Sequence, residues 1–190
     1  MNQTNAQLKE RVEKNKPKIY VACLASYNAG VLHGKWIVPS TDIDELQNQI
    51  DEVLKTSRSW NADEFAIHDY DNFYDLGEYP NLEDIIKIQE AYKNHCGGYE
   101  VVNAFLENWQ VADLDNLDDA FISWGWDSFQ DFADHEADNM IESMWTEYGI
   151  EKDCPLINHF DYESYSRSLA FDYWHFDSET QGTLIFNKNW

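Results

Sequence analysis

The alternation of apolar and polar residues predicts a small α/β unit in the first part of the chain. The strands expected from this pattern are 18–24, 31–38 and 64–68. The turn-forming residues of 26–30 favour a hairpin between the first two strands. Apolar residues at helical spacing predict a helix capped by Thr41 and running to about Lys55. We expect this unit to end near Pro80.

Helical periodicity dominates the middle of the chain. Asn81 is expected to cap a helix that Gly97-Gly98 terminates, and another helix is expected over 99–110. An Asp-rich connection follows at 113–119. The later expected elements are a strand at 120–124, a short helix at 162–169, and strands at 170–176 and 182–187.

The clearest helix in the pattern runs from Asp127 to Tyr148, with Gly149 as its C-terminal stop. Its expected buried face consists of Phe129, Phe132, Ala133, Ala137, Met140 and Met144. A stripe of carboxylates lies opposite, made of Asp127, Asp131, Asp134, Asp138 and Glu142. Because Trp145 falls nearer the stripe than the apolar face, we expect it to meet a partner or another subunit.

Charge changes the picture more than any single motif. The 190 residues include 36 acidic and 13 basic ones, for a net charge of −23, yet 43% are hydrophobic and 15% aromatic. This composition predicts a folded protein rather than an acidic disordered tail. It disfavours binding to nucleic acid or to an anionic membrane and favours a basic partner. A solvated acidic surface is the simpler alternative, although solubility needs a net charge of only about 2–8.

The charge is also unevenly distributed. Lys9, Arg11, Lys14, Lys16 and Lys18 form a basic leader that we expect to be flexible, whereas 94–151 contains no Lys or Arg. Aromatic residues are interleaved with the acids of this second stretch, which indicates that it is folded. Duplex DNA carries one charge per roughly 1.7 Å, so 23 charges correspond to about 40 Å of duplex, or roughly 12 base pairs.

Motifs for catalysis, cofactors or metals are weak or missing. The segment 113–124 lacks the Gly and the final Glu of a calcium loop, and nucleotide-binding and hydrolase signatures are absent. Adjacent His68 and Asp69 are expected to face opposite sides of a strand, so a structural His is the favoured interpretation. We therefore expect no catalysis, no cofactor and no metal. A hydrolase using paired carboxylates stays open as an alternative, ranked below the two binding functions described at the end of this section.

The localisation signals are negative. The N-terminus lacks an apolar signal core, and no segment approaches the roughly 18 apolar residues of a membrane span. The three cysteines are Cys23, Cys96 and Cys154, without CxxC spacing. These features predict reduced thiols in a cytoplasmic protein.

Three runs of sequence resemble the ArdA family of antirestriction proteins. In order they are the segment 19–36 with its Tyr27-Asn28-x-Gly30-x-Leu32-x-Gly34-x-Trp36 core, the segment 64–70 (EFAIHDY) and the segment 161–169 (DYESYSRSL). The resemblance covers the chain from about Lys18 to its end. It implies an α+β fold of three small domains in series, elongated, curved and acidic. We therefore expect an α/β domain at 18–80, a helical domain at 81–119 and an α/β domain at 120–190, while the basic leader at 1–17 lies outside the family pattern.

The resemblance also implies a function. Family members imitate bent B-form DNA, act for mobile elements, and occupy the DNA-binding groove of type I restriction–modification complexes as homodimers. The carboxylates expected to mimic phosphates are Asp63, Glu64, Asp69, Asp71, Asp75, Glu83, Asp84, Glu100, Glu107, Asp113, Asp115, Asp118, Asp119, Asp127, Asp131, Asp134, Asp138 and Glu142. The expected dimer contacts are Met140, Ile141, Met144, Trp145 and Tyr148, near an antirestriction motif at about 138–150.

One alternative function stays open at this stage. An acidic interaction module from a mobile element that sequesters another basic DNA-binding protein would have the same sequence character, so only a partner assay separates the two. The sequence does not identify the restriction system, the effect on modification or the strength of the dimer.

Overall fold

The computed structural model describes residues 16–149, 154–155 and 157–190, and the chain divides into two compact units, Met1–Leu114 and Asp115–Trp190. The fold is mixed α+β, as expected, and each unit contains a three-stranded antiparallel sheet. The expected basic leader falls almost entirely outside the described residues. The division into three domains at 80 and 119 stays a prediction.

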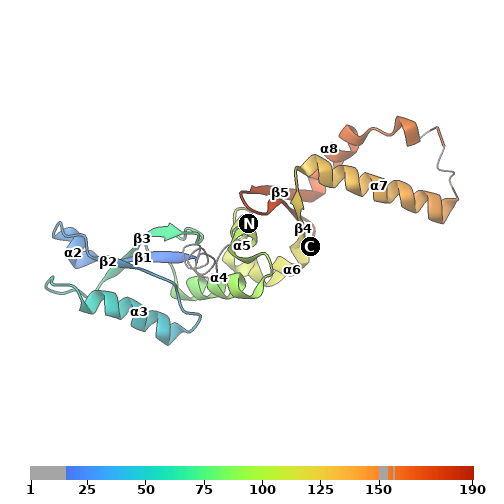
Figure 1. The fold of residues 1–190 in the computed structure, drawn as a ribbon. Coiled ribbons are helices and arrows are strands. Elements are labelled where there is room, and N and C mark those ends of the chain that lie inside the picture. The colour runs from blue at the N-terminus through green and yellow to red at the C-terminus, as the bar shows by residue number, and fades with distance from the viewer. Residues whose placement is uncertain (1–15, 150–153, 156) are drawn as a thin grey trace, which may run out of the picture. The chain divides into compact units, whose positions relative to one another are not determined.

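The first unit contains a sheet with a helix packed on one face (Figure 1). Its elements are β1 (Lys18–Cys23), β2 (Gly34–Ile37), β3 (Phe65–Asp71) and α3 (Ile43–Lys55), with strand order β2-β1-β3. Leu46 and Ile50 of α3 are fully buried, as are Ile19 and Val21 of β1. The alternation in β1 therefore places one face of the sheet in a core shared with α3.

The first two strands pair antiparallel, as the predicted hairpin requires, but their connection is longer than the predicted turn at 26–30. A short helix, α2 (Leu24–Asn28), follows β1 directly, and β2 starts only at Gly34. The buried Ser26 explains this, because its hydroxyl lies 2.7 Å from the Ser57 hydroxyl and 2.8 Å from the Ser59 hydroxyl. These contacts hold 24–28 against the segment after α3, and the helical turn satisfies the local backbone groups.

The cap of α3 is also corrected. Asp42, rather than Thr41, is the N-cap, and its carboxylate accepts a hydrogen bond of 2.9 Å from the Glu45 backbone N–H. A carboxylate at this position satisfies an orphan donor and suits the positive end of the helix dipole.

Two helices complete the first unit, α4 (Leu82–Asn94) and α5 (Gly98–Leu106). Asn81 caps α4 as predicted, with its side chain accepting from the Glu83 N–H at 3.0 Å. The predicted stop at Gly97-Gly98 is displaced, since His95 is the C-cap of α4 and Gly98 already begins α5. In place of the helix predicted over 99–110, α5 begins one residue earlier and ends four residues earlier, at Leu106.

A buried polar group joins the loop after β3 to both helices. The Tyr92 hydroxyl of α4 donates to the Asn103 side chain of α5 and accepts from the Tyr74 backbone N–H at 2.9 Å. Asn103 in turn donates to the Asn72 carbonyl at 3.2 Å. Burial raises the pKa of Tyr92 well above its usual value. We name these four residues the Tyr92 node.

The Asp-rich segment predicted as a connection is helical. It forms the 3-10 helix η1 (Val111–Asn116) and the short helix α6 (Leu117–Ala120). Leu114, Leu117 and Ala120 are buried, so apolar residues at spacings of three anchor the segment while the acids between them face outward. The sequence prediction overlooked this spacing because the acids dominate the composition.

The sheet of the second unit has strand order β4-β6-β5, with β4 (Phe121–Trp126), β5 (Tyr173–Ser178) and β6 (Gly182–Asn187). The central strand β6 buries Leu184, Ile185 and Phe186 completely. The strand predicted at 182–187 is confirmed. The short helix predicted before β5 is α8 (Tyr162–Asp172), which extends to Asp172 and displaces the start of the predicted strand at 170.

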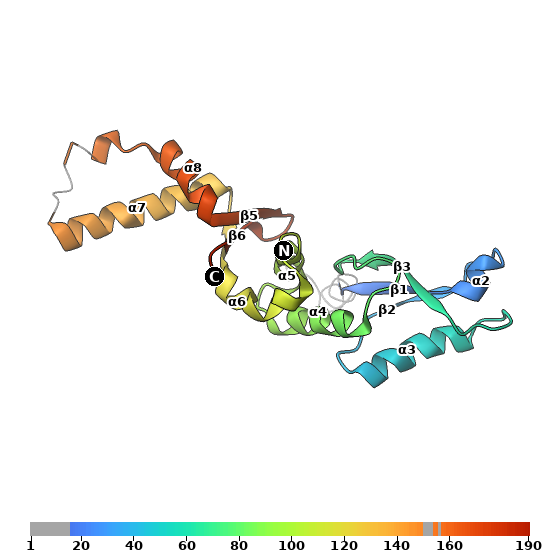
Figure 2. The same cartoon turned by 180° about the vertical axis from the view of Figure 1, so that it is seen from behind.

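Helix α7 (Phe129–Tyr148) packs on this sheet and then runs alongside α8, as both ribbon views show (Figures 1 and 2). Ser128 is the N-cap, accepting from the Asp131 N–H, so Asp127 precedes the helix rather than opening it. Gly149 ends the helix in the left-handed conformation, as predicted. A short 3-10 helix, η2 (Ile157–His159), precedes α8.

The buried face of α7 is only partly as predicted. Phe132, Ala133 and Ala137 are buried, and Ile141 joins them. Phe129 and Met140 are half-buried, and Met144 is 39% exposed. The aromatic contacts with the sheet involve the start of the helix, where the Phe132 ring lies 5.3 Å from that of Tyr173. Met144 lies roughly three turns further along, which accounts for its exposure.

Candidate partner-binding surface

The predicted phosphate-mimicking carboxylates all lie in described parts of the chain, and none of the 18 is buried. Thirteen are exposed, and the half-buried ones are Asp71, Asp84, Glu100, Asp113 and Asp134. They occur in both units. Carboxylates that remain in contact with water keep their charge at little desolvation cost and are accessible to a partner.

Helix α7 presents the longest regular row, which we name the α7 stripe and define as Asp131, Asp134, Asp138 and Glu142. Its members follow one another at spacings of three or four residues, so they lie about 4.5–6 Å apart along the axis. One DNA strand has a charge every 3.4 Å or so. The stripe alone is therefore less dense than DNA, and mimicry needs further acidic elements.

Neutral donors, rather than cations, contact the stripe. The Ser128 hydroxyl donates to Asp131 at 2.7 Å, and the Gln130 amide donates to Asp134 at 2.6 Å. The Tyr162 hydroxyl of α8 donates to Asp138 at 2.7 Å, which raises the pKa of Tyr162 above its usual value. These bonds fix the side chains in place and leave their negative charge uncompensated.

Few cations are available to neutralise these carboxylates, and three of those that are described already have partners. Lys18 pairs with Asp71 at 3.4 Å in the first unit, and Arg167 pairs with Glu163 at 3.6 Å in the second. The ammonium of Lys188 donates to the Ala170 carbonyl at 2.7 Å. Because 94–151 contains no Lys or Arg, the local field there is set by carboxylates.

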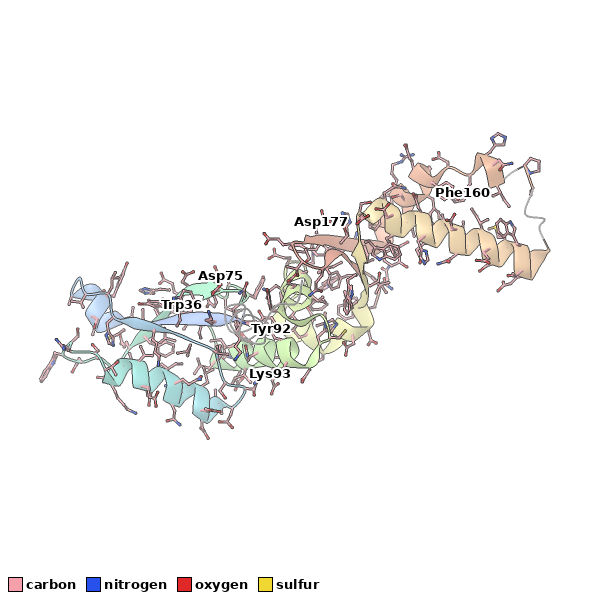
Figure 3. All side chains as sticks on the ribbon, viewed as in Figure 1. Trp36, Asp75, Tyr92, Lys93, Phe160 and Asp177 are labelled. Carbon is pink, nitrogen blue, oxygen red and sulfur yellow. The ribbon has the colours of Figure 1, made fainter. Side chains whose placement is uncertain are left out.

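The first unit presents carboxylates around β3. Asp63 and Glu64 precede the strand, and Asp69 and Asp71 are part of it. Figure 3 labels Asp75 in the loop that follows, where its carboxylate accepts from the Gly77 N–H at 2.7 Å. That bond, and the bond of 3.0 Å from the Gln110 N–H to Asp113, give these two acids a structural task as well.

Equally exposed carboxylates lie outside the predicted set. They include Asp44, Glu45 and Glu52 on α3, Glu90 on α4, and Asp161, Glu163, Asp172, Asp177 and Glu179 near the end of the chain. The signal that could have found those on α3 is its helical spacing, since its buried residues recur at three and four and leave the acids outward.

The residues expected at a dimer contact differ from one another in how far they are buried within the chain. Ile141 is buried within the chain, Met140 and Trp145 are half-buried, and Met144 is exposed. The side chain of Tyr148 is outside the described ones. All five belong to the last two turns or so of α7, and their role in a dimer stays a prediction.

A cavity of about 550 Å³ beside the end of α3 is lined by residues that include Asp51, Lys55, Trp60 and Asp63, but Trp60 is 90% exposed, so the cavity is open to solvent. The His68 ring packs edge-to-face against the Tyr27 ring, with ring centroids 4.8 Å apart. Within the described ranges, no three His, Cys, Asp or Glu residues are grouped to hold a metal ion. No described helix combines the length and apolarity needed to cross a membrane.

The predicted thiols are found as free cysteines. Cys23 is buried, Cys154 is half-buried and Cys96 is exposed, and none of the three forms a disulfide.

Comparison with known proteins gives the surface its context. No curated protein sequence matches the chain. A family model described as "Antirestriction protein (ArdA)" matches residues 19–180, which is most of the chain and includes all the carboxylates of the predicted set. The match includes all three sequence runs noted above, at 19–36, 64–70 and 161–169. The chain therefore belongs to the ArdA family of antirestriction proteins.

Proposed function

We propose that this protein blocks type I restriction–modification enzymes by occupying their DNA-binding groove with carboxylates that stand in for DNA phosphates. One observation carries the proposal: the carboxylates of the predicted set face solvent on both units, while cations are nearly absent from the second. Membership in an antirestriction family supports the choice of target. The protein is proposed to act in the bacterial cytoplasm, without catalysis or a cofactor.

The mechanism is collective electrostatics. Lys and Arg side chains that normally contact phosphates would instead contact carboxylates of this protein. Each exposed pair is worth only about 0.2–1 kcal/mol, so affinity has to come from many pairs formed together. The net charge of −23 provides enough carboxylates for this. Binding should weaken as salt rises, because exposed charges are screened within about 10 Å at 0.1 M ionic strength.

A competition assay tests the proposal. Labelled duplex DNA bound to a type I methyltransferase core is titrated with the purified protein at low and at moderate salt. We expect displacement at near-stoichiometric protein, with a higher concentration required at moderate salt. An unrelated acidic protein of similar size and net charge is the control for bulk charge.

Failure has a clear form in this assay. If several type I cores keep their DNA at every protein concentration, the proposed target is wrong. A pull-down with the full chain would then identify the basic partner, which is the outcome expected of an acidic module directed at another DNA-binding protein.

We propose further that the acting form is a homodimer joined near the end of α7. Sedimentation equilibrium should give about twice the chain mass of 22.3 kDa. The exposed Met144 offers a test, since Met144→Asp would put a charge into the contact and shift the protein toward monomer. Phe171→Asp, at a position 82% exposed, is the matched control. A monomer for the unmodified chain would contradict this part of the proposal.

A further inference from the structure

The face of the first sheet opposite α3 has a row of side chains fixed by strand register. Tyr20 of β1 pairs directly with Trp36 of β2 on one side and with Asp69 of β3 on the other. Directly paired residues in antiparallel strands point to the same face of the sheet. Ile19 and Val21, the neighbours of Tyr20, are fully buried toward α3. The row Trp36–Tyr20–Asp69 therefore lies on the outer face.

The two rings of this row form a compact aromatic pair. Their centroids lie 5.4 Å apart in an edge-to-face arrangement, and Trp36 is 39% exposed. Gly34 makes the arrangement possible, because a Cβ there would lie 2.7 Å from the Tyr20 ring. The Tyr20 ring thus lies over the neighbouring strand instead of standing upright. We name Tyr20, Trp36 and Asp69 the outer-face row.

Further aromatic and acidic groups surround the row. A bulge between Tyr20 and Val21 makes His68 an extra residue in β3, and its ring packs against that of Tyr27. Asp69 also contributes to a cavity of about 290 Å³ beside β3, whose lining includes Asp75 and Glu78. Lys18, the cation nearest along β1, is already paired with Asp71.

The chemistry of this face selects one kind of occupant. Exposed ring faces attract cations, and a guanidinium both stacks on aromatic rings and pairs with carboxylates. Asp69, Asp75 and Glu78 repel nucleic acid and phosphate. A second copy of the chain is proposed to join near the end of α7 and not on this face. A purely apolar peptide would leave the carboxylates unpaired. A basic side chain of a partner protein meets both requirements.

We propose that the outer-face row binds an arginine side chain of the partner, with the guanidinium against the Trp36 and Tyr20 rings and paired with Asp69. This inference rests on the proposed function for the identity of the partner. It adds a contact that differs in kind from the carboxylate array, because stacking on an aromatic ring is screened by salt less than an exposed ion pair is. The row would therefore keep the complex together at salt concentrations that weaken the ion pairs of the carboxylate array.

The first experiment tests the row without a restriction enzyme. The full chain is labelled with 5-fluorotryptophan, and the Trp36 resonance in the fluorine NMR spectrum is assigned as the signal missing from Trp36→Phe. A nona-arginine peptide is then titrated in, with nona-lysine in a parallel titration. We expect the Trp36 signal to move more with arginine than with lysine, and more than the signal of Trp60, whose ring lines the same cavity as Lys55. A Trp36 signal that moves no more than that of Trp60 overturns the proposal.

The second experiment uses displacement of DNA from the methyltransferase core. Trp36→Ala should raise the concentration for half-displacement about tenfold at moderate salt, and Asp69→Asn by several-fold. Trp60→Ala, which removes an equally large exposed ring elsewhere in the unit, should leave it unchanged. Circular dichroism and Trp36→Phe, which keeps an aromatic ring at the position, separate a lost contact from a lost fold.

The two proposals fail in different ways. If the unmodified chain displaces DNA and both Trp36→Ala and Asp69→Asn displace it equally well, the row is not a contact and the proposed function stands. If the unmodified chain displaces no DNA, the proposed function fails, and the peptide titration still decides whether the row binds arginine.

Discussion

The two compact units of this protein carry similar numbers of acids but very different numbers of bases. The first, Met1–Leu114, has 19 acidic and 10 basic residues, for a net charge of −9. The second, Asp115–Trp190, has 17 acidic and 3 basic residues in a shorter chain, for a net charge of −14. The second unit therefore holds more uncompensated charge on less structure.

The difference shows what each unit needs in order to stay folded. The first combines an apolar core under α3 with the Tyr92 node, and some of its acids have cationic neighbours. The second must overcome greater self-repulsion, which lowers the stability of a compact state. It does so with aromatic packing, where Phe132 contacts the rings of Trp126, Phe129 and Tyr173 at centroid distances of 5.3–5.9 Å.

The largest expected effect is on that aromatic packing. Phe132→Ala should lower the free energy of unfolding by about 3–5 kcal/mol, because the ring is 2% exposed and its removal leaves a cavity. Urea denaturation followed by tryptophan fluorescence measures the change. Phe171→Ala, at an exposed position of α8, should stay within about 0.5 kcal/mol of the unmodified protein. Equal losses in the two variants would mean that aromatic packing does not hold the second unit together.

The first unit should respond most to the loss of its buried hydroxyl. Tyr92→Phe should cost about 1–3 kcal/mol, because the Tyr74 N–H and the Asn103 side chain lose a buried partner. Tyr79→Phe, 70% exposed, is the matched control. A change below the error of the urea titration would show that the Tyr92 node is dispensable.

The same residue predicts an alkaline limit for the first unit. The pKa of Tyr92 is raised in the folded state, so its contribution to stability is complete below the unfolded value near 10 and is lost as pH rises above it. The pKa of Tyr70 is raised to about 12, chiefly by burial, and acts in the same direction. Stability should therefore fall above pH 10, and less steeply in Tyr92→Phe. A parallel fall in both proteins would rule out this origin.

A fourth prediction concerns binding and rests on the proposed function. Two triple variants remove equal charge, Asp134→Asn, Asp138→Asn and Glu142→Gln from the α7 stripe, and Asp44→Asn, Glu52→Gln and Glu90→Gln from the first unit. The α7 triple should raise the half-displacement concentration about tenfold, or about 0.5 kcal/mol per lost pair, and the other triple should raise it less. If the first-unit triple has the larger effect, the acidic second unit is not the main contact.

The smallest expected effect is the response of the α7 stripe to salt. Its three successive pairs of like charges each destabilise the helix by about 0.2–0.5 kcal/mol, and salt screens this repulsion. Hydrogen exchange should show a gain of a few tenths to about 1 kcal/mol in the opening free energy of α7 amides on going from low to moderate salt. Amides of α3, whose last turn contains Lys55, should gain less. Equal gains would contradict the comparison of the two units.

The sequence predicted helices better than it predicted connections. Asn81 and Gly149 were recognised as cap positions because a cap depends on the chemistry of one residue and its near neighbours. The helix α2 was missed because the contacts that favour it come from Ser57 and Ser59, some 30 residues away. The exposure of Met144 was missed for a related reason, since periodicity does not show how far along α7 the sheet extends.

The candidate site also has a part that the sequence predicted and a part that it did not. That carboxylates would be exposed follows from the cost of burying charge, and all 18 are accessible. The outer-face row was not predicted, although Gly34 and Trp36 were noted as part of the resemblance. Finding it requires the register that sets Trp36, Tyr20 and Asp69 side by side, together with the bulge that shifts β3 by one residue. Register of this kind depends on tertiary pairing rather than on local pattern.

The placement of every described carboxylate outside the core has a consequence for how such a protein changes over generations. A charge that touches no packed neighbour can be lost at one surface position and regained at another without a structural penalty. Selection would then act on the total and the spread of charge, while Gly34, Phe132 and the Tyr92 node would be held in place one residue at a time. Among relatives, we expect the acids to drift along the surface while the scaffold beneath them stays the same.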